Sequence, residues 1–243
     1  MNLGLDLINA TAMLEGPLSD KGSWLLSARR GYVDLILALM GADEELKPQY
    51  ADLYGKIVYD LAERDKLTLN GLYAWDKNRI NEADDENDLK STYQNAMLWT
   101  KWRHEFSERI WSDVFLYSGA ATQERRKGPD GVDTRDFGFL GAKGELTARL
   151  LDAHTIRGGV EWRGSTATYD YSIREQRPGI DQYERIRANV DDSGGEVKAY
   201  LQDEWQIHPR LAFNVGARYH YNVTCSVAQD SILVSGDTGQ LRK

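Results

Sequence analysis

The chain has 243 residues and a formal net charge of −8, with 41% hydrophobic and 28% charged residues. This acidic balance argues against a nucleic-acid-binding surface, which is normally basic, and no stretch approaches the roughly 20 apolar residues that a membrane-spanning helix needs. The charged residues recur at alternate positions within strand-like segments, whereas a soluble β-sandwich needs apolar side chains on its inner faces.

About ten segments of alternating apolar and polar residues follow one another, joined by connections that are short and long in turn. Short turns are predicted at residues 16–22, 62–66, 105–108, 148–152 and 208–210, and long connections at 33–48, 77–89, 119–133, 172–194 and after 222. Transmembrane barrels have short periplasmic turns and longer extracellular loops. The predicted fold class is therefore all-β, an antiparallel up-and-down transmembrane β-barrel segment of about ten strands.

Three further predictions concern the N-terminal third. Residues 1–7 enter an alternating strand directly, without the basic and apolar regions of a signal peptide, so we expect the chain to begin within a longer protein. The apolar run at 35–40 is too short to span a membrane and is predicted to form a brief surface helix. The dipeptide Asn70-Gly71 is typical of a hairpin turn, but it interrupts a good alternation and is predicted to be strand.

Period-2 alternation places one set of residues on lipid and the other on a polar lumen. The segments 49–61, 67–76, 155–163 and 211–221 show it clearly, and their polar sets include Tyr54, Arg157, Glu161, Arg163 and Arg218. Segment 110–118 has large residues on both faces, which leaves its register open. The candidates for contact with lipid are Leu69, Tyr73, Trp75, Val160, Trp162, Leu211, Phe213, Val215, Ala217 and Tyr219.

Two long connections carry charge clusters that are candidates for ligand contact in extracellular loops. Glu82, Asp84 and Asp85 form an acidic loop that either binds calcium or is simply solvated. Arg125, Arg126 and Lys127 either attract an anionic ligand, such as a lipopolysaccharide phosphate, or form a solvated charged loop.

No motif in the sequence predicts catalysis, a metal site or a cofactor. The four histidines lack the spacing of metal ligands, and the single cysteine, Cys225, excludes an intrachain disulfide. A nucleophile elbow, a P-loop and a Cys/His pair are all missing from the sequence. The protein is therefore predicted not to be an enzyme.

Three runs carry a family resemblance: GSWLLSARRGY at 22–32, PQYADLYGKIVYDL at 48–61 and AYLQDEWQIHPRLAFNVGARYHY at 199–221. They resemble the β-barrel portion of TonB-dependent outer-membrane receptors. The resemblance covers most of residues 1–222, which are predicted to be the partial barrel, and residues 223–243 form a divergent or truncated tail. In that family a signal peptide, a TonB box and a plug domain precede a barrel of 22 strands, of which this chain matches about ten.

The resemblance implies a location in the outer membrane of a Gram-negative bacterium and a role in importing a scarce nutrient of the siderophore, cobalamin or saccharide class. It implies as partners the outer-membrane lipid, the remaining barrel strands and plug, and a TonB-type partner acting through the N-terminal region; no nucleic acid is expected. The alternatives are a passive pore or adhesin-type barrel without a plug and, third, a soluble β-rich binding protein.

Overall fold

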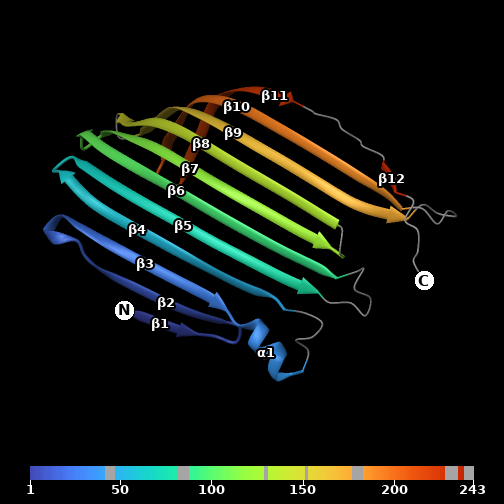
Figure 1. The fold of residues 1–243 in the computed structure, drawn as a ribbon. Coiled ribbons are helices and arrows are strands. Elements are labelled where there is room, and N and C mark those ends of the chain that lie inside the picture. The colour runs from blue at the N-terminus through green and yellow to red at the C-terminus, as the bar shows by residue number, and fades with distance from the viewer. Residues whose placement is uncertain are drawn as a thin grey trace, which may run out of the picture.

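A computed structural model describes residues 1–41, 47–80, 88–128, 131–150, 153–176, 183–227 and 235–237. Within these residues, strands β1 to β11 form one antiparallel sheet in which each strand pairs with the next along the chain (Figure 1). This order confirms the all-β, up-and-down fold. The strands are β1 (Asn2–Leu5), β2 (Asn9–Pro17), β3 (Gly22–Gly31), β4 (Gln49–Ala62), β5 (Asp65–Ile80), β6 (Leu89–Ser107), β7 (Ile110–Lys127), β8 (Gly131–Leu150), β9 (His154–Gln176), β10 (Tyr183–His208), β11 (Leu211–Val227) and β12 (Ser235–Asp237), which pairs with β10.

Two short helical elements interrupt the strands. Helix α1 (Val33–Leu39) follows β3 and confirms the brief surface helix predicted in the first long connection. A 3₁₀ turn, η1 (Ser19–Lys21), joins β2 to β3. No helix among the described residues has the length and apolar character needed to cross a membrane.

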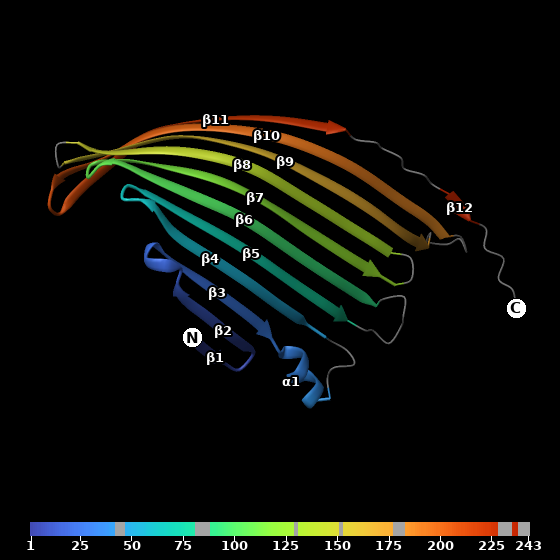
Figure 2. The same ribbon diagram turned by 60° about the vertical axis from the view of Figure 1, so that its left-hand side comes forward.

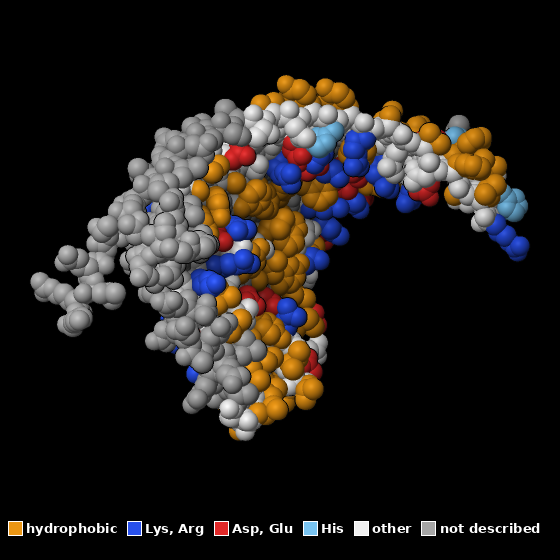
Figure 3. Space-filling model, turned by 90° about the vertical axis from the view of Figure 1, so that its right-hand side faces the viewer, with side chains coloured by type: hydrophobic (Ala, Val, Ile, Leu, Met, Phe, Trp, Pro, Cys, Tyr) orange, Lys and Arg blue, Asp and Glu red, His pale blue; other side chains and the backbone are white. Residues whose placement is uncertain are grey.

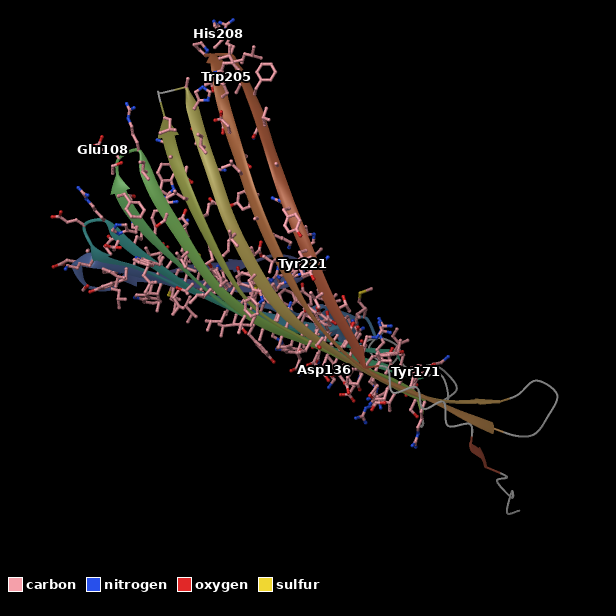
Figure 4. All side chains as sticks on the ribbon, turned by 90° about the horizontal axis from the view of Figure 1, so that it is seen from above. Glu108, Asp136, Tyr171, Trp205, His208 and Tyr221 are labelled. Carbon is pink, nitrogen blue, oxygen red and sulfur yellow. The ribbon has the colours of Figure 1, made fainter. Side chains whose placement is uncertain are left out.

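The short connections predicted from the sequence lie at one end of the sheet, although residues 151 and 152 of the fourth lie outside the described residues. They join β2 to β3, β4 to β5, β6 to β7, β8 to β9 and β10 to β11. Figure 4 shows Glu108 and His208, from two of these turns, at one end of the sheet, with Tyr171 toward the opposite end. The strand interpretation of Asn70 is also confirmed, because Asn70 pairs with Lys56 on β4 and with Trp99 on β6.

Several long connections are shorter than predicted, because the strands extend into them. The connection predicted at 119–133 is strand through Lys127 and again from Gly131. The connection predicted at 172–194 is strand through Gln176 and from Tyr183, and β11 continues to Val227. The apolar alternation stops where both faces become polar, but backbone pairing continues, and pairing defines the strand.

One turn was missed, and it raises the number of described strands in the up-and-down order above the ten predicted. Residues 1–7 were predicted to enter an alternating strand, with the first short turn at 16–22, but the chain already turns around Asp6, between β1 and β2. The Asp6 carboxylate accepts hydrogen bonds from the backbone N–H groups of Ile8 and Asn9, at 2.9 and 2.7 Å. Such a side-chain-to-backbone bond replaces a ladder bond and turns the chain.

The sheet is twisted and curved into an open arch (Figure 2). Among the described residues no hydrophobic side chain is buried, so the sheet encloses no packed core. We use "outer face" for the side that carries Leu69, Val160 and Val215 with their cross-strand partners, and "inner face" for the opposite side. In Figure 3 charged side chains gather beneath the arch and apolar side chains lie on its convex side.

Candidate functional site

The inner face is built around a few acidic side chains that each hold several cations. Asp113 on β7 is 4% exposed and lies directly opposite Arg103 on β6. Arg103 donates two hydrogen bonds to it, from Nε to Oδ1 and from Nη2 to Oδ2, both at 2.8 Å. Lys101 Nζ lies 3.2 Å from Oδ1. The two parallel hydrogen bonds hold the Arg103 and Asp113 side chains in place on the inner face, because an arginine binds a carboxylate best in this bidentate geometry.

A second cluster surrounds Glu145 on β8. Lys143 Nζ lies 2.9 Å from Oε2, and Arg157 Nε on β9 lies 3.8 Å from Oε1. Tyr200 on β10 also donates its hydroxyl hydrogen to Glu145, across the intervening strand β9. The residue between them is Gly159, which pairs with both, and a Cβ there would lie 2.9 Å from the Tyr200 ring. Because Gly159 has no side chain, the Tyr200 ring can cross β9 and reach Glu145.

A third cluster surrounds Glu196 on β10. Its carboxylate lies 2.8 Å from Arg163 Nη2, 2.7 Å from Lys198 Nζ and 2.9 Å from His220 Nε2. Side chains from β9, β10 and β11 thus meet one carboxylate. The inner face is consequently a wall of paired charges, suited to water or to a polar partner rather than to hydrocarbon.

Large aromatic residues also face inward on β7, where the sequence left the register open. Lys101 Nζ and Lys143 Nζ lie 5.3 and 5.5 Å from the centre of the Phe115 ring. Arg149 lies 5.1 Å from the centre of the Trp111 ring. Cations over aromatic faces are attracted by the ring quadrupole, so these rings fit among the charges of the inner face.

The ten residues predicted to contact lipid all lie on the outer face. Tyr73 pairs with Leu53 and Ala96, and Val160 pairs with Gly144 and Ala199, so the apolar positions continue from strand to strand. Many of the side chains are well exposed, and Val215 is 70% exposed. Contact of this face with lipid remains a prediction, but a continuous exposed apolar surface of this kind is rare on soluble monomers.

Two histidine–aspartate pairs border the apolar outer face at the short-turn end. His104 Nδ1 lies 2.8 Å from Asp65 Oδ1, which also accepts a hydrogen bond from Trp102 Nε1 at 2.9 Å. His154 Nδ1 lies 2.7 Å from Asp203 Oδ2, and its ring stacks on Trp205 at 5.4 Å (Figure 4 labels Trp205). Aromatic rings beside polar groups are typical of a membrane–water interface.

The three basic residues predicted to lie in a loop lie in a strand instead, and their side chains are on both faces of the sheet. Arg125, Arg126 and Lys127 are the last residues of β7. Arg126 pairs with Lys90 and Val132 on the outer face, whereas Arg125 pairs with Ser91 and Asp133 on the inner face, as does Lys127 with Leu89 and Gly131. Their loop placement was wrong because β7 and β8 pair almost to their ends. Ligand contact by these residues remains a prediction.

The acidic candidates Glu82, Asp84 and Asp85 lie outside the described residues. Cys225 lies in β11 opposite Ser193. In the part of the chain that the structure describes, no three His, Cys, Asp or Glu side chains are grouped so as to hold a metal ion.

Sequence reasoning placed Arg157, Glu161, Arg163, Arg218 and Tyr54 on the polar side, and the cross-strand register puts all five on the inner face. It missed the acidic residues at the centres of the clusters. The signal for Glu145 and Glu196 was present, since each lies at a polar position of an alternating strand, whereas Asp113 shares its face with Trp111 and Phe115 and carried no such signal. Lys143 and Lys198 lie two residues from their carboxylates on the same strand, whereas the other cation partners lie on neighbouring strands, where only the register identifies them.

The known proteins that match this chain have the same β-barrel architecture. The family model described as "TonB dependent receptor-like, beta-barrel" matches residues 40–239. Among curated protein sequences no match is found.

Three solved structures illustrate the likeness. The siderophore receptor PiuA from Acinetobacter baumannii has a TM-score of 0.68 and 10% identity over 94% of this chain and 42% of that chain. The ferric-catecholate import receptor Fiu from E. coli K12, in its open form, has a TM-score of 0.70 and 12% identity over 90% and 43%. P. aeruginosa FpvA bound to a heterologous pyoverdine has a TM-score of 0.62 and 12% identity over 90% and 36%. The chain thus spans about two fifths of the length of the structures it matches.

Proposed function

The chain belongs to the TonB dependent receptor-like β-barrel family, and on this premise we propose that it forms part of the wall of an outer-membrane receptor that imports a scarce nutrient. The observation that carries the proposal is the opposition of the two faces. The outer face is apolar and exposed, while the inner face holds its charges in clusters around Asp113, Glu145 and Glu196. A wall with lipid on one side and a water-filled lumen on the other requires this opposition.

The proposed location is the outer membrane of a Gram-negative bacterium. The short turns would lie on the periplasmic side and the long connections on the cell surface, as in other transmembrane barrels. A role in transport is consistent with the prediction that the protein is not an enzyme.

Closure of the barrel requires additional strands. In the described residues the sheet runs from β1 to β11, and these two strands end the pairing order. Unpaired edge N–H and C=O groups in hydrocarbon each cost several kcal/mol, so an open edge is not tolerated in a bilayer. We propose that strands and a plug beyond those described here complete the receptor, and that a TonB-type partner supplies energy through a segment preceding the barrel.

The proposed substrate class is a ferric siderophore. Its support is the naming of PiuA as a siderophore receptor and of Fiu as a ferric-catecholate import receptor. The charged inner face suits polar cargo, but it selects no particular chemistry. Cobalamin and saccharides therefore serve as the comparison substrates in the test.

The test is uptake by cells that lack their own ferric-siderophore receptors and express this protein as its gene encodes it. We expect accumulation of ⁵⁵Fe supplied as a ferric catecholate, and loss of that accumulation when the proton motive force is collapsed or when TonB is deleted. Cells with an empty vector are the control. Uptake that persists without energy would identify a passive pore instead, and energy-dependent uptake of cobalamin or a saccharide alone would overturn the siderophore class.

A further inference from the structure

Helix α1 carries an exposed apolar face at the long-connection end of the sheet. Its sequence is VDLILAL, in which Asp34 is the single charged residue. Leu35 is 54% exposed, Leu39 is 89% exposed, and Met40, at the end of the helix, is 75% exposed. We use "apolar helix face" for these three residues. A helix that faces water normally carries polar residues on its exposed side, so this face indicates an apolar partner.

Two contacts hold α1 to the outer side of the sheet. Asp34 Oδ2 accepts hydrogen bonds from Arg30 Nη2 on β3, at 3.3 Å, and from Gln49 Nε2 on β4, at 3.1 Å. Arg30 lies opposite Ala51, which lies opposite Trp75 on the outer face, and Gln49 is two residues before Ala51 on the same face. The charged residue of the helix is therefore held against outer-face side chains.

The apolar helix face is directed away from these contacts. With about 3.6 residues per turn, Leu35, Leu39 and Met40 each lie more than a quarter of a turn around the helix from Asp34. The Asp34 side chain is only 11% exposed. The helix thus turns its polar side toward the sheet and its apolar side outward, which is the reverse of what a helix packed against a protein core shows.

The depth of α1 is fixed by its attachment to β3. Trp75 is the last apolar residue on the outer face of β5, and it lies opposite Gln94 on β6. Arg30 is at the same level, since the cross-strand partners run from Trp75 through Ala51 to Arg30. A tryptophan at the end of an apolar strand marks the membrane interface. Helix α1 begins three residues after Arg30, which is roughly 10 Å of extended chain at most, so it begins close to that interface.

The apolar outer face continues as far as this helix. Arg30, which holds Asp34, also lines a groove of about 630 Å³ together with Ala28, Leu53 and Trp75. The apolar helix face is therefore next to the surface that we propose to lie in lipid.

The turn between β1 and β2 lies beside α1 (Figures 1 and 2), and it is apolar as well. The backbone N–H of Tyr32, just before the helix, donates a hydrogen bond to the Ile8 carbonyl at 2.9 Å. Leu5 and Leu7 in this region are 81% and 84% exposed. Two separate segments of the chain thus present leucines at the same place, which favours one extended apolar environment around both.

The rest of this end of the sheet differs. On the outer face of β8, β9 and β10 the exposed residues toward the long connections include Asp136, Asp170 and Asp191 (Figure 4 labels Asp136). The sequence that follows α1 is also acidic, at residues 43–45. The apolar character beyond the strands is thus confined to α1 and the neighbouring turn. An apolar helical face flanked by polar residues is typical of a segment that lies in a membrane interface.

We propose that α1 is an interfacial helix, and that the apolar helix face enters the acyl-chain boundary of the outer leaflet. Hydrocarbon accepts leucine and methionine side chains that water disfavours, and the paired Asp34 leaves no exposed charge on the helix to oppose insertion. The inference rests on the proposed function, because it requires the outer face to lie in a membrane with the long connections on the cell surface.

The test places nitroxide spin labels in the protein as its gene encodes it, in a Cys225→Ser background, reconstituted in phosphatidylcholine nanodiscs. Labels at Leu35→Cys and Leu39→Cys report on the helix. A label at Val215→Cys serves as the lipid reference and a label at Asp136→Cys as the water reference. Each label is exposed to oxygen, which concentrates in lipid, and to a nickel chelate, which stays in water. Heat-modifiable migration on a gel checks that each variant folds.

We expect both helix labels to be relaxed more strongly by oxygen than by the nickel chelate, as at Val215 and opposite to Asp136. A second variant tests the cause. Leu35→Gln with Leu39→Gln, carrying its label at Met40→Cys, should shift that label from the oxygen-accessible to the nickel-accessible class. The matched control is Leu18→Gln with Leu61→Gln, which removes two exposed leucines at the opposite end of the sheet and should leave the Met40 label in lipid.

Three results would overturn the proposal. Helix labels accessible to the nickel chelate, with Val215 in lipid, would reject the interfacial helix alone. Helix labels shielded from both reagents would show that another protein segment covers the apolar helix face. An unchanged Met40 label in the Leu35/Leu39 variant would show that the leucines do not hold the helix in lipid. A Val215 label in water would instead reject the membrane orientation on which the proposed function depends.

Discussion

The hydroxyl of Tyr117 donates a hydrogen bond to Glu161 at 2.6 Å, although strand β8 lies between their strands. Gly141 on β8 pairs with Tyr117 and leaves the space through which the ring passes. The same arrangement joins Tyr200 to Glu145 over Gly159, and Tyr50 to Asn9 over Gly31. On the inner face, a glycine thus allows a tyrosine to connect strands that are not neighbours.

The glycine beneath Tyr117 is expected to be essential for this connection. A Cβ at Gly141 would lie 2.3 Å from the Tyr117 ring, so Gly141→Ala must displace the ring and break its hydrogen bond. We expect a loss of about 1 to 3 kcal/mol in the free energy of unfolding, measured by denaturant titration in vesicles. Gly144→Ala on the same strand is the control, because no atom lies within 4 Å of its Cβ, and it should be neutral or slightly stabilising. Equal effects of the two substitutions would contradict this interpretation.

Removal of the buried Asp113 carboxylate is expected to destabilise the sheet more than removal of the less buried Asp52 carboxylate. Asp113→Ala leaves Arg103 and Lys101 without their shared anion. Because these two side chains are 36% and 32% exposed, water offsets part of the loss, and we expect about 1 to 3 kcal/mol in the same unfolding assay. Asp52→Ala is the control: its partner Arg29 is 50% exposed, so the cost should stay within about 1 kcal/mol.

Adjacent residues on β6 test which face contacts lipid. Leu98 is 57% exposed on the outer face, opposite Gly71 and Ser118, while Met97 lies opposite Leu72 on the inner face. Leu98→Arg is expected to cost about 2 to 4 kcal/mol if it lies near the midplane, because a charge must leave water for hydrocarbon. Met97→Arg, at the same depth, should cost clearly less. The reverse order in vesicle-based unfolding would assign lipid to the other face.

Cysteine labelling on whole cells tests the orientation of the barrel. Glu63 lies in the short turn between β4 and β5, and Lys127 ends β7 at the opposite end of the sheet, before residues 128–130. In a Cys225→Ser background, a membrane-impermeant maleimide should label Lys127→Cys on intact cells. Glu63→Cys should react only after the outer membrane is permeabilised. The opposite pattern would invert the topology.

The turn at Asp6 is expected to weaken in acid. The backbone N–H groups of Ile8 and Asn9 donate to the Asp6 carboxylate and lower the pKa of Asp6 from its ordinary value. A carboxyl group whose pKa is lowered by folding stabilises the turn fully above its ordinary pKa, and the stabilisation disappears as the pH falls through the folded pKa.

Amide hydrogen exchange of Ile8 and Asn9 measures this turn directly. Their protection should decline in acid through that range, and Asp6→Ala should abolish it at neutral pH. Asp6→Asn retains an acceptor oxygen, so it should keep protection but lose its dependence on pH. Protection that does not change with pH in the parent protein would contradict the role of the carboxylate.

The sequence by itself determined the features that depend on neighbouring residues. Alternation along one strand predicted that Leu69, Val160 and Phe213 lie on one face and Arg157 and Arg218 on the other, and the structure places them so. The five short turns, the brief helix and the family resemblance were also present in local patterns. A period of two residues is a local property of an extended chain, so it survives without knowledge of the fold.

Only the tertiary structure decided what depends on register between strands. It assigned Arg103 to Asp113, placed Tyr200 over Gly159, and separated Arg126 from Arg125. It also showed that β7 and β8 continue into residues that were predicted to form a loop. There both faces are polar, so the sequence shows no apolar alternation, although the backbone still pairs. The physical reason is that cross-strand partners lie far apart in the sequence, and a shift of one residue in register would move every side chain to the opposite face.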